Sequence, residues 1–194
     1  MLTAIVHFIN NIFKLLLVGR NINLKILLKF GLPAILGAFA GARLLLFLPQ
    51  MQPVFEYRIG EKLFEVAPVN LLVAILMILF SLFEIIPQLS KISFNKERLV
   101  EGGIISGFFG GLSGHQGALR SMFLIRLNLS KETFIATGIA IACLVDVSRL
   151  SVYFFKYREM NIAENYNIVI TAVLSAFAGA YIGNKLLKNA TIKF

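Results

Sequence analysis

The chain has 194 residues, of which 58% are hydrophobic and 15% are charged, and its 19 Lys and Arg against 10 Asp and Glu give a net charge of +9. Typical soluble domains are about 45–50% apolar and about 25% charged, so this composition excludes an ordinary soluble domain and a disordered chain. The single cysteine, Cys143, excludes an intrachain disulfide and a cysteine metal cluster. In so apolar a chain, excess Lys and Arg are typical of the cytoplasmic loops of a membrane protein and do not require nucleic acid as a partner.

Five continuous apolar segments predict membrane-spanning helices, since one span needs about 20 such residues. In chain order they cover residues 2–18, 26–48, 66–83, 133–155 and 165–184. The first segment is not typical of a signal peptide, because Lys14 interrupts it and no small-residue cleavage site follows. The runs are continuous rather than alternating, which favours helices over the strands of a membrane barrel.

A further segment, 102–126, is rich in glycine and is broken by a turn at 113–117. Each of its halves is too short to span a bilayer alone. The two halves therefore form either one span or a re-entrant pair that enters and leaves on the same side.

Loop charges favour the re-entrant pair, because Lys and Arg concentrate on the cytoplasmic side. The connections 19–29 and 87–101 carry more Lys and Arg than Glu and are predicted inside, whereas 50–65 has three Glu against two basic residues and is predicted outside. A re-entrant pair leaves Lys185, Lys188 and Lys193 inside, whereas a single crossing would leave them outside. We expect an all-α integral membrane protein with five transmembrane helices and one Gly-broken re-entrant half-helix pair.

An internal repeat underlies this arrangement. The sequence Ala-Phe-Ala-Gly-Ala occurs at 38–42 and again at 176–180. A polar pair precedes each copy at nearly the same distance, namely Asn11 with Lys14 and Asp146 with Arg149. The loop charges give the two copies opposite orientations, which is typical of the inverted repeats of secondary transporters.

We therefore predict a single transmembrane domain over 1–194, with repeat halves at about 1–88 and 99–187. Both copies also carry a Gly-x-x-x-Gly pair, Gly37 with Gly41 and Gly179 with Gly183. The main expectation for these glycines is close packing between helices.

Polar residues within the apolar spans are candidate site residues, since charge at bilayer depth costs at least about 2.5–3.5 kcal/mol. His7, Asn11 and Lys14 share one helical face, and Asp146 and Arg149 share another. Two interpretations stay open for the second pair: an ion pair that only neutralises itself, or a pair that lines a substrate path. Lys14 either snorkels to the inner surface or joins the same path.

The turn at 113–117 indicates a binding site more specifically than these polar residues do. Its glycines let the backbone approach a ligand, and a helix that begins after it directs free N–H groups and a positive dipole end at the turn. A small anion suits such a position, with Arg120 one helical turn further on; the alternative is a kink made for packing. The sequence shows no phosphate-loop pattern, no metal-ligand spacing and no catalytic triad, so we expect neither an enzyme nor a cofactor or metal.

Residues 102–153 resemble the second half of the sulfite exporter family TauE/SafE. The motifs that carry the resemblance are the turn 110–117, the apolar half-helix 118–126, the Leu-Ser-Lys-Glu turn 129–132 and the Thr-containing helix from Ala136. The resemblance implies a multi-pass transporter of small, often sulfur-containing anions in the cell membrane of a bacterium or archaeon. It also implies a substrate site made from the glycine turn and the long helix that follows it.

Two departures from the family pattern carry expectations of their own. The first Gly-rich hairpin and the last helix of the family are expected to be missing from 1–194. The usual multi-glycine turn is replaced by 113–117, which points to a different substrate.

The sequence thus predicts a secondary transporter of small anions such as sulfite, thiosulfate or a sulfonate. The alternatives are a passive anion channel and a truncated, non-transporting membrane assembly protein. Expected partners are the anion and the lipid bilayer, with a homo-oligomer as a further candidate and no nucleic acid. The predicted substrate-binding residues are Asn11, Lys14, Ser113, Gly114, His115, Gln116, Gly117, Arg120, Asp146 and Arg149.

Overall fold

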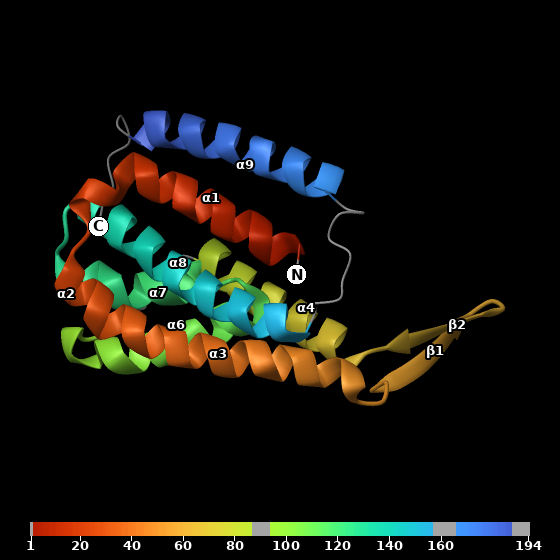
Figure 1. Cartoon of the computed structure of the whole chain (residues 1–194). Helices are drawn as coiled ribbons and strands as arrows, with labels where there is room; N and C mark the ends of the chain where they lie inside the picture. Colours follow the sequence, from red (N-terminus) through yellow and green to blue (C-terminus); the bar gives the residue numbers. More distant parts are fainter. Residues whose placement is uncertain (1, 87–93, 157–165, 188–194) are drawn as a thin grey trace.

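The computed structural model describes residues 2–86, 94–156 and 166–187 (Figure 1). The main helices are α1 (Leu2–Val18), α3 (Leu32–Phe47), α4 (Pro68–Ile85), α6 (Leu99–Ser113), α7 (Gly117–Leu124), α8 (Lys131–Lys156) and α9 (Tyr166–Leu187). Short helical segments connect them: η1 (Gly19–Asn21), α2 (Leu24–Ile26), the π-helix η2 (Leu27–Gly31), η3 (Leu48–Gln50), η4 (Lys96–Arg98) and η5 (Ile125–Leu127). The strands β1 (Phe55–Ile59) and β2 (Lys62–Val66) lie between α3 and α4.

Four helical stretches are long and apolar enough to cross a bilayer, at Leu2–Asn21, Leu24–Gln50, Lys131–Phe155 and Tyr166–Leu186. The apolar part of α4, Pro68–Phe83, is shorter. Many large apolar side chains point outward, as expected where lipid replaces water; Leu16 is 80% exposed and Phe155 is 84% exposed. The chain is therefore a mostly helical membrane protein, as its composition predicted.

Helices α3 and α6 pack backbone to backbone. Gly41 of α3 lies against the carbonyl of Phe108, and Gly107 of α6 lies against Ala34, so that a methyl group at either glycine would collide with main-chain atoms. Small residues permit this close approach, which maximises van der Waals contact in a bilayer that offers little hydrophobic drive for association. The same kind of contact is made by Gly37, Gly103 and Gly111.

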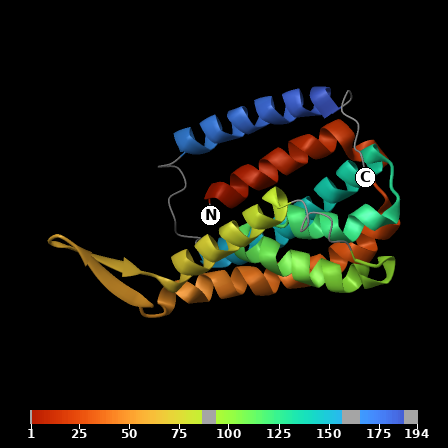
Figure 2. The ribbon, with the colours of Figure 1, turned by 180° about the vertical axis from the view of Figure 1, so that it is seen from behind.

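Helix α8 lies at the centre of the bundle, between α1 and α3, and α9 covers the outer side of α1 (Figures 1 and 2). Ile141 and Val145 of α8 belong to the buried core. The hydroxyl of Ser148 donates a hydrogen bond of 3.0 Å to the carbonyl oxygen of Ile35 on α3. Phe13 of α1 and Phe177 of α9 stack with ring centroids 4.2 Å apart. These contacts place the polar residues of α8 inside the protein rather than toward lipid.

Helices α6 and α7 form an antiparallel pair. The N–H of Phe94, ahead of α6, donates to the carbonyl oxygen of Met122 in α7 at 3.1 Å, and the rings of Phe94 and Phe123 stack at 4.4 Å. The start of α6 and the end of α7 therefore lie at the same end of the bundle, with the glycine turn at the other end of the pair.

A β-hairpin projects from the helical body (Figure 1) and was not predicted, because the 50–65 connection was interpreted only as a charged outer loop. Phe55 pairs with Val66 and Tyr57 with Phe64, and Gly60 has a φ of +62°, as a two-residue hairpin loop with a leading glycine requires. Every residue of β1 is exposed. The hairpin is the one departure from an all-α architecture within the described residues.

The two ends of the bundle differ. The end of α1, α2 and the start of α8 lie together, and the N–H of Asn23 donates to Oγ1 of Thr137 at 2.9 Å; the hairpin and the end of α3 lie at the opposite end (Figure 1). Several charges used to predict the topology fall outside the described residues, namely Lys91, Lys188 and Lys193.

Candidate functional site

Asp146 is the centre of a buried polar cluster. One carboxylate oxygen, Oδ2, accepts a hydrogen bond of 2.8 Å from Nδ2 of Asn11 on α1, and the other, Oδ1, accepts one of 3.2 Å from Nη2 of Arg149. Asp146 and Arg149 are each only 5% exposed. Their spacing of three residues places both on one face of α8, and α1 brings Asn11 to that face. The predicted pairing of Asp146 with Arg149 is therefore present, with Asn11 as a third member.

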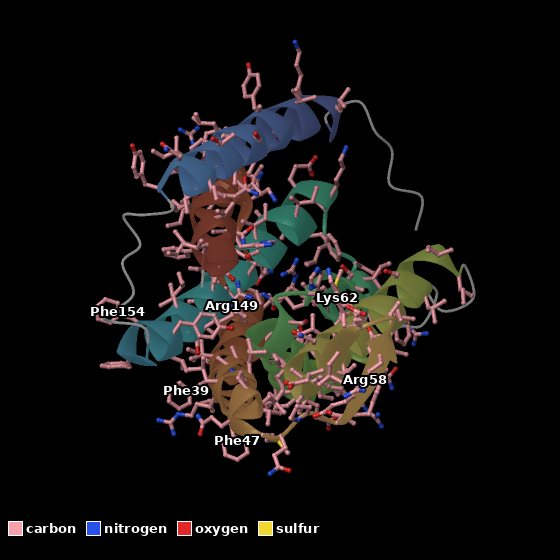
Figure 3. All side chains as sticks on the ribbon, turned by 90° about the vertical axis from the view of Figure 1, so that its right-hand side faces the viewer. Phe39, Phe47, Arg58, Lys62, Arg149 and Phe154 are labelled. Carbon is pink, nitrogen blue, oxygen red and sulfur yellow. The ribbon has the colours of Figure 1, made fainter. Side chains whose placement is uncertain are left out.

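The glycine turn meets this cluster at Gly114. Its φ of +82° ends α6 in the left-handed conformation that glycine adopts without strain. The guanidinium of Arg149 packs against it, because a Cβ on Gly114 would lie 2.5 Å from Nη1. Figure 3 shows Arg149 in the interior of the bundle, whereas Phe39, Phe47 and Phe154 lie at its periphery.

Local hydrogen bonds hold the turn in place. The hydroxyl of Ser113 donates to the carbonyl oxygen of Phe109 at 3.0 Å and accepts from the N–H of His115 at 3.3 Å. The hydroxyl of Tyr153 on α8 donates to the carbonyl oxygen of Gly111 at 3.4 Å. Ser113 therefore shapes the turn, and Tyr153 fixes the end of α6 against α8.

Three buried polar atoms around the turn have no hydrogen-bond partner within the described parts of the chain. They are Oε1 of Gln116, Nη1 of Arg120 and Nε of Arg149. Buried polar groups in proteins are nearly always paired, and leaving one unpaired costs about 1–3 kcal/mol. Of the two arginines, Arg149 packs on the glycine turn and Arg120 lies against Gly138 of α8. A buried cationic donor without a partner beside a glycine turn is the arrangement expected of a site that binds an anion.

A cavity of about 270 Å³ opens at the turn. That is many times the ~15 Å³ that one water molecule needs. Its lining comes from the turn and from α4: Gly114, His115, Gln116, Gly117, Ala118, Met77, Phe80 and Ser81. The sequence did not indicate the three α4 residues, because they lie in an apolar stretch of α4 in which Ser81 is the one polar residue between Leu71 and Phe83.

Arg120 belongs to the same region. Its guanidinium lies over Gly138 of α8, since a Cβ there would be 3.3 Å from Nε, and its charge interacts with that of Asp146. His7 of α1 also interacts electrostatically with Asp146, Arg149 and His115. His7 shares a helical face with Asn11, so its spacing was the available signal, although it was not included among the predicted site residues.

Lys14 is placed apart from these groups. No ion pair or hydrogen bond among the described residues joins it to Asp146 or Arg149. With the amide of Asn10 oriented to satisfy both neighbours, Oδ1 accepts from Nζ of Lys14 at 3.2 Å and Nδ2 donates to the carbonyl oxygen of Ala176 at 3.3 Å. Lys14 therefore faces a second cavity, of about 440 Å³, between α1, α8 and α9.

The charged groups of the Asp146 cluster suit the binding of a charged ligand. In the part of the chain that the structure describes, no three His, Cys, Asp or Glu side chains gather to hold a metal ion. The polar groups lie inside apolar helices, next to a broken helix whose second half begins at the turn. Buried charges and broken helices of this kind mark substrate pathways in membrane transporters.

The fold and the buried cluster thus define a multi-pass membrane protein of the transporter class. The family model for the sulfite exporter TauE/SafE matches residues 1–193, so the chain belongs to that family, as the sequence motifs predicted. The family consists of transporters rather than enzymes. No curated protein and no solved structure matches the chain.

Proposed function

We propose that this protein is a secondary transporter of small, sulfur-containing anions across the cytoplasmic membrane of a bacterium or archaeon. Membership of the TauE/SafE family supports transport of this class of anion. The observation that carries the proposal is the position of Arg149, a buried cation that packs on the glycine turn and whose Nε has no hydrogen-bond partner among the described residues.

In the proposed site, the anion binds at the turn. The N–H groups at the start of α7 are not used within that helix and carry the positive end of its dipole. Gly114 and Gly117 leave the backbone uncovered on the side of the cavity. Arg149 offsets the charge of the anion, and Arg120 adds a second buried cation nearby.

The proposed membrane arrangement has five spans, α1, α3, α4, α8 and α9, with α6 and α7 as a re-entrant pair. At about 1.5 Å per residue the 15 residues of α6 reach about 22 Å, which is short of the ~30 Å apolar core. The backbone hydrogen bond between Phe94 and Met122 joins the start of α6 to the end of α7. It supports a pair that enters and leaves the membrane on the same side. The re-entrant turn then lies at bilayer depth, beside Asp146 and Arg149.

Asp146 has one of two roles in this scheme. It either holds Arg149 in position or carries a proton that is coupled to anion movement. The substitution Asp146→Asn separates them: a purely positioning carboxylate leaves residual uptake dependent on the proton gradient, whereas a coupling carboxylate leaves uptake independent of it.

The direct test is uptake of radiolabelled sulfite, thiosulfate and a small sulfonate into proteoliposomes that contain the full chain. The proposal predicts saturable uptake by the wild type, loss of uptake in Arg149→Gln, and wild-type uptake in the control Arg58→Gln. Arg58 is suited to this control because it is exposed on the hairpin. Uptake that does not saturate would instead indicate a passive channel, and equal uptake by R149Q and wild type would refute the assigned site.

A further inference from the structure

We propose that His7 of α1 is the residue that binds a proton together with the anion, and that it thereby couples anion movement to the proton gradient. This inference rests on the proposed function, because it requires an anion beside Arg149. It names the coupled ion and the residue that carries it, and it gives Asp146 the role of holding Arg149 in position.

The position of His7 follows from two contacts between α1 and α8. Nδ2 of Asn11 donates to Oδ2 of Asp146 at 2.8 Å, and Ala4 belongs to one buried cluster with Val152. The two helices therefore run antiparallel, so a residue between Ala4 and Asn11 lies level with a residue between Val152 and Asp146. His7 is such a residue, and it lies level with the turn of α8 that follows Asp146.

That turn of α8 carries Arg149, and the second histidine of the chain lies near it as well. The guanidinium of Arg149 packs against Gly114, and His115 is the next residue of the glycine turn. The imidazole of His7 interacts electrostatically with Asp146, Arg149 and His115. The two histidines of the chain are thus both close to one buried ion pair.

The charges around His7 link proton binding to anion binding. Asp146 attracts a proton on the imidazole of His7, whereas Arg149 of α8, His115 of the turn and Lys14 of α1 itself repel it. An anion held by Arg149 offsets these repelling charges. The anion and the proton therefore each favour the binding of the other, and the coupling is reciprocal.

Helix α9, which packs on the other side of α1, presents no titratable group to His7 within the described part of the chain. The two helices run in the same direction (Figure 1), and Phe13 stacks on Phe177 with ring centroids 4.2 Å apart. Because His7 precedes Phe13 by six residues, it lies beside the stretch 168–176 of α9, which contains no titratable side chain.

His7 suits proton exchange better than Asp146 does. Both oxygens of Asp146 already accept hydrogen bonds, Oδ2 from Asn11 at 2.8 Å and Oδ1 from Arg149 at 3.2 Å. A proton on this carboxylate would remove the charge that holds Arg149, whereas a proton on His7 leaves both bonds intact. His7 is also exposed, so a proton can reach it, and the charge of histidine ordinarily changes between about pH 5 and pH 8.

The test is isothermal titration of the full chain in detergent with thiosulfate and with methanesulfonate, two anions whose own charge does not change near neutral pH. Each titration is carried out in two buffers that differ in ionisation enthalpy, because the difference in binding heat counts the protons taken up per anion. We expect the wild type to take up a proton with the anion, and to bind the anion about tenfold more tightly at about pH 6 than at about pH 8.

Two substitutions of His7 make the test specific. His7→Gln should bind the anion without proton uptake and with the affinity that the wild type has at about pH 8. His7→Lys carries a fixed positive charge, so it should bind at about pH 8 as tightly as the wild type does at about pH 6, again without proton uptake. Because His7 is exposed, both variants should keep the wild-type melting temperature. The control Arg58→Gln, on the exposed hairpin, should behave as the wild type.

The possible results distinguish the role of His7 from the anion site itself. Anion binding by the wild type without proton uptake, or unchanged proton uptake in His7→Gln, would overturn the role of His7 and leave the anion site intact. Loss of proton uptake in His115→Gln but not in His7→Gln would place the proton on the turn and would also overturn it. No binding of either anion by the wild type would refute the anion site, and the role of His7 with it.

Discussion

The guanidinium of Arg149 occupies the space that a side chain on Gly114 would need, with Nη1 2.5 Å from the position of such a Cβ. This contact joins the long helix α8 to the broken helix formed by α6 and α7. It explains why a residue in a left-handed turn and a residue in the middle of an apolar helix belong to one site.

The first prediction concerns Gly114. The substitution Gly114→Ala imposes about 1–2 kcal/mol of left-handed backbone strain and also displaces Arg149. We expect a lower melting temperature in detergent and a loss of sulfite uptake. Gly179→Ala, outside the turn, is the matched control, since a Cβ there meets nothing within 4 Å; equal behaviour of the two variants would contradict the importance of the contact.

The buried ion pair gives a second prediction. Asp146→Asn leaves Arg149 as an uncompensated buried cation and should lower the free energy of unfolding by about 3–5 kcal/mol, whereas the double variant with Arg149→Gln should recover part of that loss. Chemical denaturation in detergent measures both. The exposed pair Arg98 and Glu101, with a separation of 4.0 Å, is the control and should contribute only about 0–1 kcal/mol.

The third prediction concerns Gln116, whose replacement should lower uptake without lowering the melting temperature. Its buried Oε1 has no partner among the described residues, so replacing it with the similarly shaped Met should leave the melting temperature equal or higher. If this amide faces the anion, uptake should nevertheless fall. A variant that transports normally would show that Gln116 is structural, and a much less stable variant would show that its amide is already paired.

The same Gly→Ala substitution should affect stability differently in the two copies of the repeated sequence, on α3 and on α9. Gly41→Ala should destabilise the protein strongly, because the added methyl group meets the backbone of Phe108. Gly179→Ala at the corresponding position of α9 should leave the melting temperature of the purified chain unchanged. Equal destabilisation by both substitutions would mean that α9 is already packed on this face in solution.

The long apolar helices were the most predictable part of the fold. The segment 2–18 matches α1, and 133–155 lies within two residues of α8 at each end, because continuous apolar runs of this length leave few alternatives. The hairpin was not predicted, although Phe55, Tyr57 and Ile59 alternate with charged residues. Its strands are only five residues long, and a strand signal that short is weak next to the surrounding spans.

Within the site, the sequence spacing predicts contacts between side chains of one helix, but it does not predict which side chains of different helices meet. The spacing of three indicated that Asp146 and Arg149 would meet, and the structure pairs them at 3.2 Å. The same spacing predicts that Lys14 lies with Asn11, but Asn11 meets Asp146 on α8 whereas Lys14 contacts Asn10 and faces the cavity beside α9. The lining of the turn cavity by Ser81 depends on how α4 packs, which no local pattern encodes.

The most direct measurement is isothermal titration of sulfite into the purified protein in detergent, with wild type, R149Q and R58Q compared at one pH and salt concentration. We predict saturable binding by wild type and R58Q and at least a tenfold weaker affinity for R149Q, equivalent to about 1.4 kcal/mol or more. Sulfite binding by R149Q with wild-type affinity would contradict the assignment of the anion site to the Arg149 cluster.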